Sequence, residues 1–110
     1  MNSWDMNKSL NIKAAKKSIN WLLMAQDVGN DYGFSSHYHL KDGWFPSYPE
    51  VTGYIIPTLI EYDNIKTKNN NSYLSKNALR AADWLLDIQL PSGAFQGRLI
   101  GNHPIVPVIF

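Results

Sequence analysis

One sequence pattern occurs twice in the chain and limits what the chain can fold into. Each copy has a tryptophan, two leucines, two variable residues and a glutamine, followed by a turn with a glycine and an aromatic residue. The copies occupy residues 21–26, before Gly33-Phe34, and residues 84–89, before Gly93-Ala94-Phe95. Repetition at a spacing of tens of residues is typical of stacked supersecondary units, each of which buries its apolar face against a neighbour. The repeat therefore predicts stacked units, with function on a shared face or in a shared hollow.

Apolar residues at spacings of three and four predict three helices, over about residues 9–26, 48–62 and 73–89. Ser47 and Glu50 have the spacing of a capping box at the start of the second helix, and Pro49 falls in its first turn, where a missing N–H is harmless. Pro57 should kink this helix or move its start to a later residue. Residues 34–45 have no helical period, and their aromatic side chains favour a long ordered loop. The predicted fold class is all-α.

The size and composition of the chain exclude several classes of protein. With 110 residues, of which 45% are hydrophobic and 13% aromatic, the chain resembles one folded domain. The net charge is +1 and no basic patch alternates with aromatic residues, so we predict no nucleic-acid partner. The absence of cysteine excludes disulfides and thiolate metal sites. The sequence has no secretory signal pattern and no apolar run near the roughly 18 residues of a membrane span, so we predict a cytoplasmic protein without a membrane partner.

Two segments resemble proteins of known architecture. Residues 80–95 are similar to the glutamine-aromatic repeat of the terpenoid-cyclase and prenyltransferase toroids. Residues 43–54 resemble uncharacterised bacterial toroid proteins related to the six-hairpin glycosidases and to the C-terminal domain of uronyl epimerases. In such α/α toroids, helical hairpins form two concentric rings, and the glutamine of the repeat ties a helix end to the next turn. The resemblance extends over about residues 14–107 and implies antiparallel helical hairpins of an α/α toroid, in an incomplete ring.

The end of the sequence, residues 104–110, is apolar and stops abruptly. Termini of soluble domains are usually polar and exposed, and a fourth helix should begin here by position in the repeat. We therefore expect residues 1–110 to form one partial toroid domain, a piece of a longer protein. The alternative is a small complete protein whose tail docks in a groove or on a partner chain. A lone piece should bury its open helical faces by associating with further copies of itself.

Residues 44–54 contain most of the candidate site residues. In the toroids that this segment resembles, the loop entering an inner-ring helix faces the central cavity. This implies that four residues face a substrate: Trp44, Tyr48, Thr52 and Tyr54. Aromatic faces cover the C–H patches of sugars, while hydroxyls and carboxylates bind sugar hydroxyls. Glu50 is the candidate catalytic residue, as a general acid or base, and the alternative for Glu50 is a capping bond to the Ser47 N–H.

Histidines and further carboxylates complete the set of candidates. A glycosidase normally needs a second carboxylate across the bond, and Asp42 and Asp31 are candidates that no spacing distinguishes, although Asp42 is more typical of a turn. His37 and His39 would face one side of an extended segment, and we predict that they line the loop and reach a substrate hydroxyl. With His103 they would supply three metal ligands, but no carboxylate or cysteine spacing supports such a site. We therefore predict no metal and no cofactor.

The repeated residues themselves are interpreted as structural. Gln26 and Gln89 should close helix ends, and Trp21 and Trp84 should lie in the core, with the leucines beside them packed on one another. The favoured function is a carbohydrate-active or carbohydrate-binding protein for a polysaccharide or uronic-acid-type substrate, with a glycosidase, lyase or epimerase-like reaction if it is an enzyme. The alternatives are a non-catalytic helical scaffold or interaction module, and a terpenoid cyclase or prenyltransferase-like protein. The chain has no Asp-rich pyrophosphate motif, which counts against the last of these.

Overall fold

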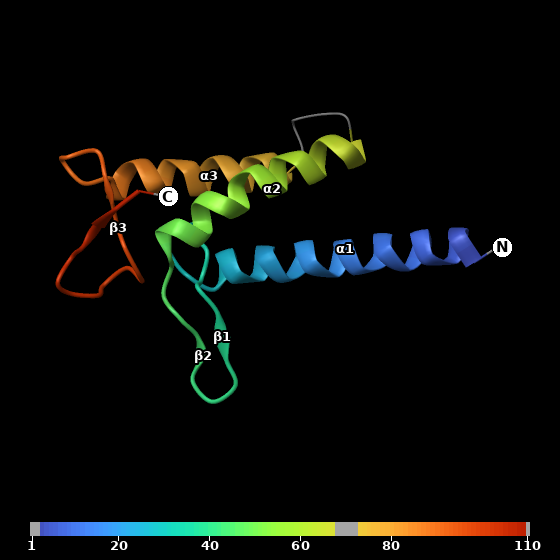
Figure 1. Ribbon diagram of the computed structural model, residues 1–110, viewed down its shortest axis with the longest axis horizontal. Helices are drawn as coiled ribbons and strands as arrows, with labels where there is room; N and C mark the ends of the chain where they lie inside the picture. The colour runs from blue at the N-terminus through green and yellow to red at the C-terminus, as the bar shows by residue number, and fades with distance from the viewer. Residues whose placement is uncertain (1–2, 68–72, 110) are drawn as a thin grey trace.

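The described part of the chain is mostly helical, with three helices and two small antiparallel sheets (Figure 1). The computed structural model describes residues 3–67 and 73–109. The helices are α1 (Ser3–Asp27), α2 (Pro49–Thr67) and α3 (Tyr73–Ile88). One sheet pairs β1 (Tyr38–His39) with β2 (Gly43–Trp44), and the other pairs β3 (Phe95–Gln96) with β4 (Pro107–Val108). The predicted helical class is confirmed, and the sheets add to it.

α2 and α3 run in opposite directions, side by side, and form a helical hairpin (Figure 1). Ala78 and Ala81 of α3 are fully buried, and their small side chains allow the two helices to approach closely. Leu59 of α2 is also fully buried in this core. Asp63 of α2 is buried as well, and its carboxylate accepts a hydrogen bond of 2.6 Å from the Ser75 hydroxyl of α3. The hairpin is therefore held by both apolar packing and a buried polar bond.

The helices differ from the predicted ranges mainly at their outer ends. α1 begins at Ser3 rather than near residue 9, because no glycine or proline interrupts the early residues and Asp5 in the first turn favours the positive end of the helix dipole. α2 continues past the predicted end at residue 62 to Thr67 and remains helical through Pro57. α3 begins at the predicted residue and ends at Ile88.

Both repeated glutamines close helix ends, as predicted. The Gln26 side-chain amide donates to the Tyr32 carbonyl at 2.9 Å, within the turn that follows α1. The Gln89 amide donates to the Gly93 carbonyl at 2.8 Å, within the turn that follows α3. Gln26 also donates to the carbonyl of Asn77 in α3 at 2.9 Å, so the first copy of the repeat is tied directly to the helix of the second.

The two repeated tryptophans lie in different environments. Trp84 is 7% exposed, and its ring lies so close to Gly33 that a Cβ atom on this glycine would be 2.7 Å from it. Trp21 is 49% exposed, so the prediction that it lies in the core is wrong. Its ring packs against Trp44 of β2 at a centroid distance of 4.8 Å instead. Because the turn between α1 and Phe34 brings the backbone of Gly33 under α3, Trp84 packs on this turn and not on the Trp21 stripe.

The chain after α3 is extended rather than helical over residues 93–109. Residues 93–109 form an arm in which Phe95 pairs with Val108 and Gln96 with Pro107. The prediction of a fourth helix near residue 104 is therefore wrong for residues 104–109. The Ile100 N–H donates to the Ser47 carbonyl at 2.9 Å, which fixes the arm beside the start of α2.

Within residues 3–67 and 73–109, none of the helices combines the length and the apolar character that crossing a membrane requires.

Candidate functional site

The chain between the β1–β2 hairpin and α2 is the frame on which the candidate site is built. Backbone hydrogen bonds continue the hairpin pairing, from Phe45 to His37 and from Ser36 to Pro46, and the Tyr48 N–H donates to the Phe34 carbonyl. The Tyr48 carbonyl then accepts the first helical bond of α2 from Thr52. Pro49 is therefore the first helical residue, a position that suits proline because its ring fixes a helical φ angle.

The expected capping box does not form. The Ser47 hydroxyl donates to Asp31 Oδ1 at 2.8 Å rather than bonding within α2, and Glu50 accepts a hydrogen bond of 3.1 Å from the Tyr48 hydroxyl. The Gly33 N–H donates to the same oxygen of Asp31 at 2.9 Å. Asp31 thus joins the turn after α1 to the start of α2. Glu50 does not cap the helix and instead bonds the hydroxyl of Tyr48.

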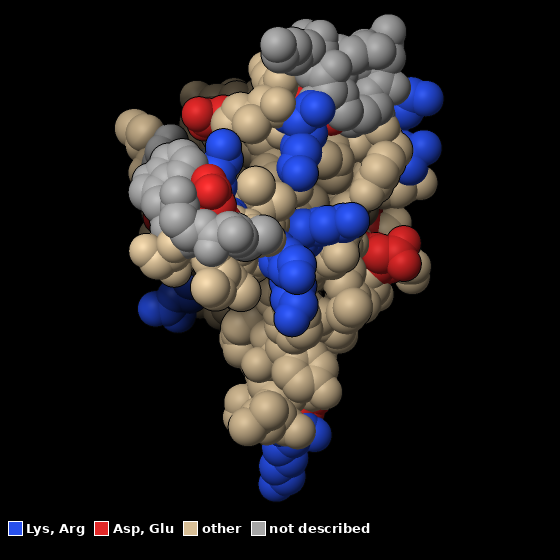
Figure 2. Space-filling view, turned by 90° about the vertical axis from the view of Figure 1, so that its right-hand side faces the viewer, with Lys and Arg blue, Asp and Glu red and all other residues tan. Residues whose placement is uncertain are grey.

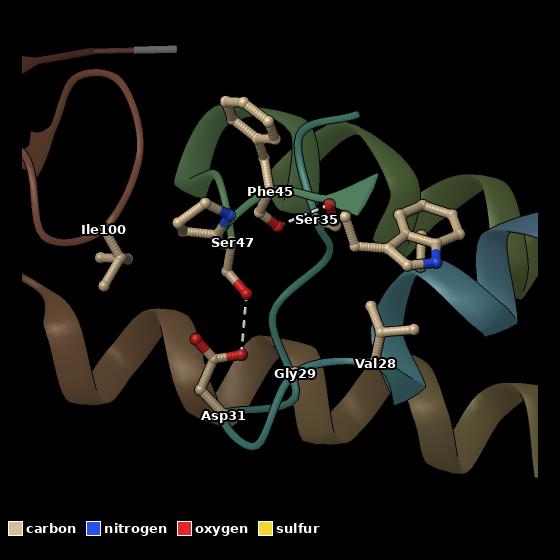
Figure 3. Close-up of a pocket in the computed structure, with 10 residues that line it drawn as sticks. Val28, Gly29, Asp31, Ser35, Phe45, Ser47 and Ile100 are labelled. Carbon is tan, nitrogen blue, oxygen red and sulfur yellow. Dashed lines mark hydrogen bonds between the residues drawn. The ribbon is translucent and has the colours of Figure 1, made fainter. Parts of the chain in front are cut away.

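A cavity of about 280 Å³ lies around Asp31 and Ser47 (Figure 3). Trp44, Phe45 and Ile100 are among the residues that line it. Its polar groups are already engaged by the fold: Asp31 holds Ser47 and Gly33, and the Ser35 hydroxyl donates to the Phe45 carbonyl at 2.7 Å. Because these groups are committed to structural bonds, this cavity offers few polar partners to a ligand.

A second hollow, which we call the Arg98 groove, is lined by side chains that make fewer structural hydrogen bonds than those around Asp31. It is an open groove of about 430 Å³ lined by eight residues: Ser36, His37, Phe45, Tyr48, Val51, Arg98, Leu99 and Asn102. The groove brings together the hairpin, the start of α2 and the arm. Phe45 also lines the cavity around Asp31, so the two hollows share this residue. Of the predicted site residues, His37 and Tyr48 line the groove.

Arg98 has a backbone conformation that is uncommon for a residue with a side chain. Its φ angle is 66°, in the left-handed region. The turn that contains it is pinned by hydrogen bonds from the Gly97 N–H to the Val106 carbonyl at 2.7 Å and from Gln96 Nε2 to the Leu99 carbonyl at 2.8 Å. Such conformations are concentrated at ligand sites, where the surrounding structure maintains them. Tyr32 has a similar φ angle of 69°, so Arg98 is the candidate binding residue of the groove because it combines this conformation with a charged guanidinium group on the groove lining.

The structure places the other predicted site residues outside the groove. Thr52 is fully buried and its hydroxyl accepts the Phe34 N–H at 2.9 Å, so it supports the core instead of facing a substrate. Tyr54 is 63% exposed on α2 and lines neither hollow. Trp44 lines the cavity around Asp31. His39 Nδ1 accepts the N–H groups of Lys41 and Asp42, both at 3.2 Å, and so stabilises the hairpin turn.

Arg98, Phe45 and Asn102 are groove residues that the sequence did not single out. Arg98 had one signal, because it is the only Asp, Glu, Lys or Arg residue after Asp87 in an otherwise uncharged segment. His37 lies against Phe45, with ring centroids 4.2 Å apart, and its Nδ1 is 2.7 Å from the Ser36 hydroxyl.

Within residues 3–67 and 73–109, no three His, Asp or Glu side chains gather closely enough to hold a metal ion.

The pKa of Tyr48 is raised above its ordinary value. The main cause is the hydrogen bond that its hydroxyl donates to Glu50; burial and the negative charge of Glu50 act in the same direction, and the positive charge of Arg98 opposes them. The phenol therefore stays protonated at neutral pH, as a donor to Glu50, and does not act as a base there.

We expect Glu50→Gln to lower the pKa of Tyr48 toward the ordinary value of about 10, because it removes the carboxylate that holds the phenol proton. The measurement is an ultraviolet phenolate titration, with Tyr48→Phe as the reference spectrum that isolates Tyr48. Since the folded pKa is the higher one, the stabilisation by this pair is fully present below about pH 10 and is lost as the pH rises through the raised value. Glu61→Gln, an exposed change on α2, is the control and should leave the titration unaltered.

Comparisons of the chain with protein-family models, with curated proteins and with solved structures found no match.

Proposed function

We propose that the chain binds a carbohydrate of the polysaccharide or uronic-acid type in the Arg98 groove. The observation that carries the proposal is the left-handed conformation of Arg98 beside Tyr48, with Phe45 as an apolar wall. A guanidinium group binds a carboxylate through two parallel hydrogen bonds, which suits the acid group of a uronic sugar. His37 and Asn102 add groups that can bond sugar hydroxyls, and the ring of Phe45 suits their C–H faces.

The groove supports binding better than hydrolysis. The eight residues that line it include no carboxylate, and Glu50 is connected to it only through the Tyr48 hydroxyl. A glycosidase normally uses two carboxyl groups on either side of the bond that it cleaves. We therefore propose a binding role in the first instance, with Glu50 holding Tyr48 in position.

We also propose that the α2–α3 hairpin belongs to an α/α toroid. The support is the repeat and its glutamine bonds, since Gln26 and Gln89 both tie a helix end to the following turn. A groove at the end of such a hairpin would open toward the hollow that adjoining hairpins enclose.

Arg98→Gly separates binding from folding. Glycine adopts a φ angle of 66° without steric cost, so we expect unchanged or higher stability, while the lost guanidinium should weaken binding of an oligouronide by roughly tenfold or more. Isothermal titration calorimetry measures the affinity, and thermal unfolding measures the stability. Binding of neutral oligosaccharides should change less, because only the acid group needs the guanidinium.

Lys41→Ala is the matched control, because it removes an exposed positive charge from the hairpin turn and leaves the groove intact. Equal affinity for the oligouronide in the Arg98→Gly and wild-type chains would rule out the groove as the site. Failure of the wild-type chain to bind any member of a glycan array would rule out the carbohydrate proposal itself.

The second candidate function, a non-catalytic scaffold or interaction module, is favoured by a different observation. Large apolar side chains are exposed on α1 and α3, including Leu10, Met24, Leu79 and Leu86. Extended exposed apolar surfaces are typical of protein interaction sites.

A further inference from the structure

The β1–β2 hairpin has two faces with different surroundings. On one face, the rings of Tyr38 and Trp44 pack against α1. His37 and His39 flank Tyr38 in the sequence and point to the opposite face, because side chains alternate along an extended strand. Phe45 lies on that opposite face too, with its ring centroid 4.2 Å from His37 and 6.1 Å from His39. We call these three residues the Phe45 face of the hairpin.

The Phe45 face begins in the Arg98 groove and leads out of it. His37 and Phe45 line the groove, and His39 lies beyond them, toward the turn of the hairpin. The cross-strand partner of His39 is Gly43, where a Cβ atom would have no neighbour within 4 Å, so the surface beside His39 is open. Figure 2 shows the hairpin as a narrow projection from the body of the molecule. A ligand held in the groove can therefore continue along the hairpin.

The hydrogen bonds of His39 determine which ring nitrogen is a donor to a ligand. Its Nδ1 accepts the N–H groups of Lys41 and Asp42, both at 3.2 Å. A neutral imidazole with an accepting Nδ1 carries its proton on Nε2. The His39 side chain is 49% exposed, so this N–H is available to a sugar hydroxyl. The Asp42 carboxylate lies 3.3 Å from Nδ1 and repels acid groups, so the position suits a neutral sugar.

We propose that the Phe45 face is a second subsite, which binds the neutral unit next to a uronic acid held at Arg98. This inference rests on the proposed carbohydrate function. The ring of Phe45 covers a C–H face of the glycan, and His39 Nε2–H donates to a hydroxyl of the neutral unit. The ligand is therefore an acidic heteroglycan chain with uronic and neutral units, rather than a single terminal sugar.

The dependence of affinity on ligand length tests the second subsite. Isothermal titration calorimetry compares a uronic-acid monosaccharide with a tetrasaccharide of alternating uronic and neutral units. We expect the wild-type chain to bind the tetrasaccharide about tenfold more tightly, because only the longer ligand reaches His39 as well as Arg98.

His39→Asn separates ligand binding by His39 from its role in the turn. The asparagine side-chain oxygen can accept the turn N–H groups in place of Nδ1, but the variant has no donor at the position of Nε2. We expect the tetrasaccharide to bind roughly three- to tenfold more weakly and the monosaccharide to bind as it does to the wild-type chain. Tyr38→Phe changes the other face of the same strand and is the matched control, with no expected effect on either ligand.

Heteronuclear NMR of the histidine rings reports the tautomer of His39 and its contact with the ligand. The free chain should show the Nε2–H form. The Nε2 resonance should shift when the tetrasaccharide is added and stay in place when the monosaccharide is added.

Three outcomes overturn the second subsite while the proposed function stands, provided that Arg98→Gly still weakens binding. These are equal affinity of the wild-type chain for the two ligands, unchanged tetrasaccharide affinity in His39→Asn, and an Nδ1–H tautomer at His39. A wild-type chain that binds neither ligand removes the subsite and the proposed function together.

Discussion

Replacing Trp84 with alanine should lower the free energy of unfolding by about 3–5 kcal/mol, the range for a large aromatic side chain removed from a core. The ring is 7% exposed and packs on the backbone of Gly33, where a Cβ atom would approach it to 2.7 Å. Its removal leaves a cavity between α3 and the turn after α1, and that turn carries the Tyr32 carbonyl that Gln26 holds. Urea denaturation followed by circular dichroism measures the change.

Trp21→Ala is the matched control, since it removes the same side chain at the same position of the repeat. Trp21 is 49% exposed, and its ring packs against the rings of Trp44 and Tyr38. We expect a smaller loss, of about 1 kcal/mol, from these aromatic contacts. Equal losses of stability in the two variants would contradict the difference in burial between Trp84 and Trp21.

Gly33→Ala should lower the free energy of unfolding by about 1–3 kcal/mol, although it adds only one methyl group. The added Cβ would lie 2.7 and 2.8 Å from two ring atoms of Trp84 and 2.8 Å from the Cβ of Ser47. None of these atoms is the end of a flexible side chain, so the ring and the start of α2 would have to shift. Denaturation experiments of the same kind measure the loss.

Gly29→Ala is the control for Gly33→Ala. A Cβ at Gly29 would have its nearest neighbour, an oxygen of Asp31, at 3.4 Å, so this change should be close to neutral. The part of the clash that involves the Trp84 ring should also disappear when Trp84 is absent, while the contact with the Cβ of Ser47 remains. The double variant Gly33→Ala/Trp84→Ala should therefore be less destabilised than the sum of the single changes, and strict additivity would contradict the contact.

The helices could be predicted from sequence because their apolar residues recur with the helical period over many residues. The β1–β2 hairpin was predicted only in part: an extended segment at His37 and His39 was recognised, but strands of two residues are too short for the sequence to show their pairing. The two tryptophans show a further limit. Their local sequences are nearly the same, and the different burial of Trp21 and Trp84 arises from the longer turn after the first copy, which places Gly33 under α3.

The candidate site was predicted only in part, for a geometric reason. Glu50, Thr52 and Tyr54 lie on α2, where each residue is rotated by about 100° from the one before, so alternate residues point to different sides. Thr52 consequently faces the core while Tyr54 faces solvent. Arg98 lines the groove because the hydrogen bond from the Ile100 N–H to the Ser47 carbonyl holds the arm beside the start of α2. This contact joins distant parts of the sequence, and no local pattern encodes it.

The Gln26 side chain links the two copies of the repeat. Its amide serves two carbonyls at once, one in the turn of its own unit and one at Asn77 in the helix of the next. The partly buried amide would lose one of these acceptors if the following helix were missing, and such a loss is unfavourable. A change at Gln26 would therefore loosen the turn after α1 and its contact with α3 together, because one side chain serves both.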